Sequence, residues 1–232
     1  SASNYALTAA GITIGKIGDT KGIINARGSW IRDSGNWDSR YGVFTYATST
    51  LNMTGAAKTI TSASAATFYN LNISGTISTI TNSFTIARSL TVTSTGTLSV
   101  GTGLTVDFTV NGGSWTNRGT VNGLGTLYFD YSASDSTITF GRINTAIVII
   151  RALAGAAANR VATLGANTAF RTNLTVSSAH ASNTMTLTHG TNYRLNVTGA
   201  VVLGTRGVMT QGSGTWLFNT SFTQNGASSL FT

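Results

Sequence analysis

The sequence contains no cysteine, no proline and no glutamate, and only 9% of its 232 residues are charged. The lack of cysteine excludes a disulfide framework and thiolate metal sites. Glutamate, lysine and glutamine usually cover exposed helix faces, whereas threonine, valine and isoleucine favour strands. Threonine, serine, asparagine and glycine fill the polar positions of this chain. We therefore expect an all-β protein.

Long apolar runs are also missing. The longest apolar stretch, residues 146–150, stops at Arg151, far short of the roughly 18 residues that a membrane span needs. We expect no membrane span. The first residues, SASNYAL, lack the basic and apolar regions of a signal peptide, so either the chain was never exported or its signal has been removed. The scarcity of lysine and glutamate is typical of secreted surface proteins, and we expect an extracellular or cell-surface location.

The formal net charge is +8, and arginine supplies most of the positive charge. A nucleic-acid-binding protein usually gathers its lysines and arginines into a patch or stripe. In this sequence the arginines are single residues scattered along the chain, so nucleic acid is not expected as a partner. A regular fold could still bring scattered arginines to one face, where they would bind an acidic polymer.

Apolar and polar residues alternate through much of the sequence. Leu104, Val106, Phe108 and Val110 show the pattern, with polar residues between them. A period of two places the apolar side chains on one face of a half-buried strand. Clusters of glycine, asparagine and serine, such as residues 111–113 and 212–214, supply the positive φ angles of tight turns. The sequence therefore predicts many short strands joined by turns.

The chain is also repetitive. A phrase of the form x-x-Leu-(Thr or Asn)-(Ile or Val) recurs, and its leucines are Leu71, Leu90, Leu174 and Leu195. A longer unit begins at Arg40, Arg118 and Arg206 and divides the chain into about three degenerate modules. Repeats that cannot bury their apolar faces alone stack on one another. We predict a β-solenoid (parallel β-helix) of roughly nine or ten turns, with an antiparallel β-sandwich or jelly roll as the alternative.

The predicted domain organisation has two parts. Residues 1–27 form an N-terminal strand segment, and residues 28–232 form one repeat-built β domain. In the N-terminal segment, Ile12, Ile14 and Ile17 could fill grooves of a neighbouring subunit if the strand were exchanged between copies. The alternative is a first strand that packs on its own chain.

Several phrases carry a resemblance to a known group of proteins. They are Gly35-Asn36-Trp37, residues 113–117, residues 136–140 and residues 68–73. In these phrases the chain resembles the degenerate repeats of large secreted bacterial and archaeal β-helix surface proteins of the adhesin type. The resemblance covers most of the chain after about residue 28 and implies a parallel β-helix on a cell surface. It implies no catalytic residues.

One segment combines charged and aromatic residues densely. Asp33 and Asp38 lie there beside Trp30, Trp37 and Tyr41. Aromatic faces and carboxylates suit the binding of a glycan or a cation. The alternative is a turn whose aspartates pair with neighbouring arginines, and this is the interpretation that we favour.

No other residues suggest catalysis. His180 and His189 have no carboxylate nearby in sequence, and we interpret both as exposed turn residues. We predict no catalytic residues, no cofactor and no metal site, and we expect that the protein is not an enzyme.

The sequence contains five glycosylation motifs of the form Asn-x-Ser/Thr. Their asparagines are Asn52, Asn72, Asn173, Asn196 and Asn219. Asn72 and Asn196 should point outward, because their sequence neighbours are apolar. A chain so rich in asparagine, serine and threonine contains about five such motifs by chance, so their number carries no information.

Three functional hypotheses follow. The first is a structural subunit of an extracellular filament or surface layer that associates with copies of itself, because proline and charge, which usually block strand edges, are scarce. The second is an adhesin or carbohydrate-binding module that contacts cell-surface glycans through Trp30, Trp37 and Tyr41. The third and weakest is an enzyme that degrades polysaccharides.

Overall fold

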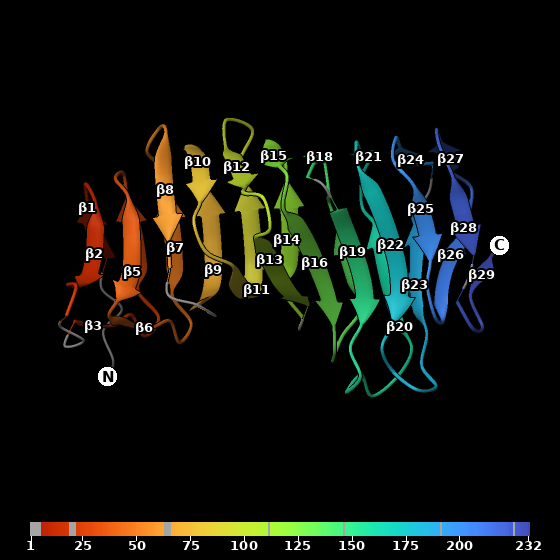
Figure 1. The fold of residues 1–232 in the computed structure, drawn as a ribbon, viewed down its shortest axis with the longest axis horizontal. Helices are drawn as coiled ribbons and strands as arrows, with labels where there is room; N and C mark the ends of the chain where they lie inside the picture. The colour runs from red at the N-terminus through yellow and green to blue at the C-terminus, as the bar shows by residue number, and fades with distance from the viewer. Residues whose placement is uncertain are drawn as a thin grey trace.

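The computed structural model describes residues 6–18, 22–62, 66–110, 112–145, 147–190, 192–224 and 226–232. These residues form 29 strands and no helix. Each strand pairs in parallel with a strand of the neighbouring turn, and the turns stack along one axis from the N-terminal to the C-terminal end (Figure 1). The protein is a β-solenoid of about ten turns. The solenoid prediction is confirmed, and the parallel pairing excludes the antiparallel sandwich.

Three strands in chain order make one turn, so the solenoid has three faces. The first face contains β1 (Ala6–Ala9), β4 (Trp30–Asp33), β7 (Thr50–Met53), the second halves of β9 (Ala66–Ile73) and β11 (Phe84–Val92), β14 (Ser114–Asn117), β17 (Ser136–Ile138), β20 (Arg160–Leu164), β23 (Met185–His189), β26 (Gly207–Thr210) and β29 (Leu230–Phe231).

The second face follows the first in every turn. It contains β2 (Ile12–Gly15), β5 (Trp37–Tyr41), β8 (Lys58–Thr61), β10 (Thr76–Ile80), β12 (Thr97–Val100), β15 (Thr120–Gly123), β18 (Arg142–Asn144), β21 (Thr168–Phe170), β24 (Arg194–Val197) and β27 (Thr215–Phe218).

The third face closes each turn. It contains β3 (Ile23–Asn25), β6 (Val43–Thr45), the first halves of β9 and β11, β13 (Thr105–Val110), β16 (Thr126–Tyr131), β19 (Ile147–Ala152), β22 (Asn173–Ser178), β25 (Val201–Leu203) and β28 (Phe222–Gln224). The long strands β9 and β11 each run from the third face onto the first.

Residues in register on successive turns are mostly 20 to 27 positions apart. The alternation seen in the sequence therefore becomes ladders of like side chains inside the solenoid. One ladder on the third face consists of Phe84, Val106, Leu127, Val148, Leu174, Val201 and Phe222. Every member except the last is buried. Each fully buried side chain of this size contributes about 1.5–3 kcal/mol through the hydrophobic effect.

Aromatic rings pack edge to face in the middle of the core. The centroid of Trp115 lies 4.6 Å from that of Phe129, which lies 4.8 Å from that of Phe140. Phe140 in turn lies 5.1 Å from Phe170 on the next turn. This chain of rings joins the first, second and third faces, so the core is continuous along the axis.

The recurring leucine phrase marks strands on all three faces. Leu71 and Leu90 belong to the first face, Leu195 to the second and Leu174 to the third. All four leucines point into the core. Within the described part of the chain, no helix is long and apolar enough to cross a membrane.

Candidate functional site

The N-terminal end of the solenoid is its first turn, formed by β1, β2 and β3. Ile12 and Ile14 are buried in β2, and Ile12 is in register with Trp37 of β5. Ile17, which follows β2, is 74% exposed. In this structure the segment packs on its own chain, and its exchange between subunits stays a prediction.

The same end presents apolar side chains to solvent. Leu7 of β1 begins a first-face ladder that continues with Ile31, Leu51, Leu71 and Leu90. The later members are buried, whereas Leu7 and Ile23 are 44% and 67% exposed. Within residues 6–18 and the later described parts of the chain, each of β1, β2 and β3 has one neighbouring strand, and its other edge pairs with no described strand.

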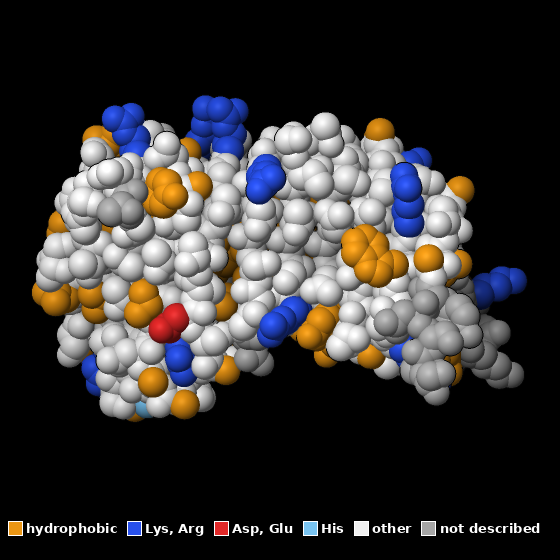
Figure 2. Space-filling model, turned by 180° about the vertical axis from the view of Figure 1, so that it is seen from behind, with side chains coloured by type: hydrophobic (Ala, Val, Ile, Leu, Met, Phe, Trp, Pro, Cys, Tyr) orange, Lys and Arg blue, Asp and Glu red, His pale blue; other side chains and the backbone are white. Residues whose placement is uncertain are grey.

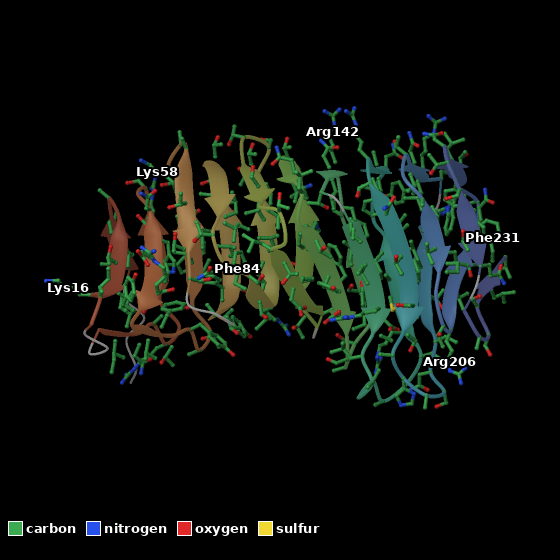
Figure 3. All side chains as sticks on the ribbon, in the orientation of Figure 1. Lys16, Lys58, Phe84, Arg142, Arg206 and Phe231 are labelled. Carbon is green, nitrogen blue, oxygen red and sulfur yellow. The ribbon has the colours of Figure 1, made fainter. Side chains whose placement is uncertain are left out.

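The C-terminal end is an aromatic cluster. Phe222 of β28 stacks on Phe218 of β27 with 5.4 Å between ring centroids, and it lies 5.1 Å from Phe231 of β29. The ring of Trp216 on β27 packs edge to face against Phe218 and Phe231. Phe231 lies at the far end of the stack from Lys16 (Figure 3). We call Trp216, Phe218, Phe222 and Phe231 the terminal aromatic cluster.

This cluster is incompletely covered. Phe222 and Phe231 are each 37% exposed, although their ladder partners on the preceding turn, Val201 and Met209, are buried. One position in the last turn is polar: Gln224 follows the buried Leu203 in register, and its Nε2 donates to the carbonyl of Ser229 at 2.7 Å. The C-terminal end is therefore mostly apolar. On β28, Gln224 is the inward-pointing side chain that is polar.

The three residues predicted to contact a glycan do not form one surface. Trp37 is fully buried and packs edge to face against Phe44, with ring centroids 4.9 Å apart, so its ring is not available to a ligand. Trp30 is 57% exposed on the first face. Tyr41 ends β5 on the second face, with the Arg40 guanidinium 5.1 Å from its ring centroid. The alternation rule places Trp37 inside because its strand neighbours face outward.

The two aspartates of the same segment also differ. Asp38 forms the expected ion pair with Arg40, with 2.7 Å between Oδ2 and Nη2. Asp33 does not pair with Arg32, because it points inward and is fully buried. Its Oδ1 accepts from the N–H of Gly35 at 2.8 Å, whereas its Oδ2 has no partner within the described structure. Burial raises the pKa of Asp33. Asp19 lies outside the described residues.

The histidines have different environments. The Nδ1 of His180 accepts backbone N–H groups from Ser182 and Asn183, as expected of a turn residue. His189 is 6% exposed and packs against Trp216, with ring centroids 5.4 Å apart, so the prediction of an exposed turn is wrong for it. It ends β23 at an inward position, which the alternation of Met185, Leu187 and His189 indicates.

The asparagines of the glycosylation motifs lie on strands or directly after them. Asn72 and Asn196 point outward between buried neighbours, as predicted. Asn173 and Asn219 are exposed, and Asn52 is half-buried. The Oδ1 of Asn173 accepts the N–H of Ala200 at 2.9 Å, so this side chain also joins two turns. Modification at the five positions stays a prediction.

One group of side chains was missed by the sequence analysis. Asp107, Tyr128, Asp130 and Arg151 meet on the outer surface of the third face, where β13, β16 and β19 are adjacent. Arg151 binds Asp130 through two contacts, Nε to Oδ1 at 2.5 Å and Nη2 to Oδ2 at 2.8 Å. Its guanidinium also lies 4.3 Å from the ring centroid of Tyr128. The usable signal was the spacing of 21 residues between Asp130 and Arg151, which equals one turn.

Asp107 is a partly buried carboxyl group that lies beside the charge of Asp130. Burial of Asp107 and the neighbouring charge of Asp130 raise the pKa of Asp107 to about 6. A carboxyl group that is buried beside a second negative charge retains its proton more readily than one in water, and Asp107 is such a group.

Comparison of the chain with protein-family models, with curated proteins and with solved structures gives no match. The fold is nevertheless defined by the strand pairing as a β-helix repeat fold. Among the described residues, histidine and aspartate form no group of three or more that could hold a metal ion.

Proposed function

We propose that this chain is a structural subunit of an extracellular filament or surface layer, in which copies associate end to end. The observation that carries the proposal is the pair of apolar, open-edged ends. Phe222 and Phe231 are exposed at one end, and Leu7 and Ile23 are exposed at the other. The degenerate repeats and the solenoid fold agree with the resemblance to β-helix surface proteins of the adhesin type.

The two ends are geometrically compatible. All strands of a face run in the same direction, so a second copy displaced along the axis keeps every pairing parallel. The free edge of β29 then lies against β1, so the first face continues from one copy to the next. The first face has one strand more than the other two, so a space of about one strand layer, about 4.8 Å, is left between β27 and β2 and between β28 and β3. This contact uses different surfaces on the two copies and therefore propagates into a fibre unless its rotation closes a ring.

Few features of the ends oppose this contact. The chain has no proline to interrupt an edge, and charged residues make up only 9% of it. Aromatic side chains such as Phe222 and Phe231 are typical anchors of protein interfaces, because each buries a large apolar area at a small cost in conformational entropy. A second copy that covers Phe222 and Phe231 would bury them, as Val201 and Met209 are buried at the same positions one turn earlier.

Negative-stain microscopy and analytical ultracentrifugation of the purified chain test the proposal. The wild-type chain is expected to form rods whose length increases with protein concentration. Phe222→Asp should abolish the rods, because it places a charge at the interface. Leu124→Asp is the matched control, since Leu124 is 68% exposed in a turn away from both ends, and it should leave the rods unchanged.

A mixing experiment identifies the kind of contact. Phe222→Asp blocks one end and Leu7→Asp blocks the other, so neither variant forms rods alone. A head-to-tail contact predicts that an equimolar mixture forms dimers, because each copy has one intact end for the other. A wild-type chain that stays monomeric at high concentration, or a mixture with no dimer, would contradict end-to-end assembly.

A further inference from the structure

The outer surface of the second face contains a hollow with a volume of about 320 Å³. Its floor is Ala169 of β21, which lies in register between Arg142 on the preceding turn and Asn196 on the following turn. A short side chain between two long ones produces the depression. Arg142, Arg194, Asn167 and Asn196 form its walls. We call this feature the arginine hollow.

The two arginines of the hollow are exposed and have no carboxylate partner among the described residues. The ion pairs of the described structure join Asp38, Asp130 and Asp135 to Arg40, Arg151 and Arg160. Arg142 projects outward at one long edge of the molecule, and Arg206 lies toward the opposite edge (Figure 3). On the face seen in Figure 2, most lysine and arginine side chains stand singly, and a broader blue group lies at the upper edge. The charge of Arg142 and Arg194 is therefore available to a ligand.

The asparagines add donors to the hollow. The Oδ1 of Asn167 accepts the backbone N–H of Arg194 at 2.8 Å, and the Oδ1 of Asn196 accepts from Nδ2 of Asn219 at 3.1 Å. Each amide oxygen already accepts a hydrogen bond from the protein, so the Nδ2 groups are the donors that these two asparagines can offer to a ligand. Guanidinium groups only donate hydrogen bonds. The hollow is thus lined by donors and favours an anionic ligand rich in acceptors.

The position of Arg142 is fixed from inside the solenoid. Asn117 is 1% exposed, and its Nδ2 donates to the carbonyls of Phe140 at 2.8 Å and Arg142 at 3.0 Å. Gly141 between them has a φ of +60°, and a Cβ at this position would lie 2.3 Å from the carbonyl oxygen of Asn117. The turn that carries Arg142 is therefore held rigidly by a buried hydrogen-bonding side chain. This arrangement reduces the entropy lost when a ligand binds.

We propose that the arginine hollow binds an acidic polysaccharide. Arg142 and Asn196 are two turns apart in register, which corresponds to about 9.6 Å along the axis, so a single small anion does not reach both walls. A polysaccharide chain with repeated carboxylate or sulfate groups is long enough to reach both walls. Its hydroxyl groups accept hydrogen bonds from the asparagine amides. Single-stranded nucleic acid fits less well, because no aromatic side chain lines the hollow to stack on a base. The hollow opens on the outer surface of the second face and ends one strand before β27, so it does not include the strand edges that end-to-end assembly would use, and the two proposals can be tested separately.

Binding is measured by isothermal titration of the purified chain with four probes: polygalacturonate, dextran sulfate, neutral dextran and single-stranded DNA. We expect binding to at least one of the two acidic polysaccharides and none to neutral dextran. The carboxylated and sulfated probes show which anionic group the hollow prefers. The double variant Arg142→Gln, Arg194→Gln should weaken binding about tenfold or more, since it removes two charge-assisted contacts.

The matched control is Arg32→Gln, which removes one exposed arginine from the first face. It should change the affinity by less than about twofold, and circular dichroism should show that all variants are folded. Loss of binding in Arg32→Gln equal to that in the double variant would mean general attraction to a basic protein and would overturn the proposal. Absence of binding to both acidic polysaccharides, or tighter binding to DNA than to either, would overturn it as well.

Discussion

Asp107 and Asp130 lie on adjacent turns, and burial of Asp107 together with the neighbouring charge of Asp130 raises the pKa of Asp107 to about 6. The cation that faces them, Arg151, binds Asp130 at two points and only partly offsets this effect. The outer surface of the third face therefore contains a group that titrates close to neutral pH.

The first prediction concerns the pH dependence of stability. The pKa of Asp107 is higher in the folded state than its ordinary value of 3.8, so the folded state binds more protons between these values. The free energy of unfolding should fall as pH rises through about 6. Asp107→Asn removes this loss and should be more stable than the wild type by about 1 kcal/mol at neutral pH, after allowance for solvent screening. Urea unfolding at about pH 4 and about pH 7.5 measures the difference.

Asp38→Asn is the control for this measurement. Its hydrogen bond from Arg40 lowers the pKa of Asp38, so the stabilisation is present at neutral pH and lost on acidification. This variant should gain no stability at neutral pH. If wild type and Asp107→Asn gave parallel stability curves, the raised pKa of Asp107 would be contradicted.

The second prediction concerns Asp33, which ends a first-face strand as Asn117 does four turns later. In both residues Oδ1 accepts the N–H of a glycine two positions on, but only the asparagine has a second group that donates. Asp33→Asn removes a buried charge and should stabilise the protein by about 1 kcal/mol at neutral pH. Thermal unfolding checks the direction, and a destabilised variant would show that Oδ2 has a partner that needs its charge.

The third prediction concerns the ion pair on the third face. Asp130 is 3% exposed, and Arg151→Met would leave it unpaired beside Asp107. The expected cost is about 2–3 kcal/mol. The double variant Arg151→Met, Asp130→Asn should recover at least half of that loss, because no buried charge remains. A double-mutant cycle in urea measures the coupling, and additive effects of the two substitutions would argue against it.

The fourth prediction separates the two tryptophans of the aromatic segment. Trp37 packs against Phe44 and Phe68, and its indole N–H donates to Ser39 at 3.2 Å. Trp37→Ala should cost about 3–5 kcal/mol, because it leaves a cavity in the core. Trp30→Ala should cost less than about 1 kcal/mol, since this side chain is mostly exposed. Equal shifts of the unfolding temperature would mean that the burial of Trp37 does not matter for stability.

Much of the fold could be predicted because alternation acts locally. A residue such as Val106 or Phe108 is directed inward by its position in the strand, and both are fully buried. The same rule predicts that Asn72 and Asn196 point outward, which the structure confirms. Alternation also directs Trp37 and His189 inward, and both are buried, but we expected Trp37 to contact a glycan and His189 to be exposed because such side chains are common on surfaces.

The proposed sites were harder to predict, since they join residues from different turns. Asp130 and Arg151 are 21 positions apart, and Arg142 and Arg194 come from strands separated by a whole turn. Turn lengths along the chain vary between about 20 and 27 residues, so no fixed spacing aligns one turn with the next. The register must be known before such neighbours can be recognised.

The sequence by itself determined the all-β class, the inward and outward directions of most side chains and the scarcity of residues that block strand edges. Only the tertiary structure decided which residues of different turns become neighbours. It brings Asp107 next to Asp130, and it places Ala169 between Arg142 and Asn196. The physical reason is that side-chain direction follows from backbone geometry within one strand, whereas lateral contacts depend on the number of residues in every intervening turn.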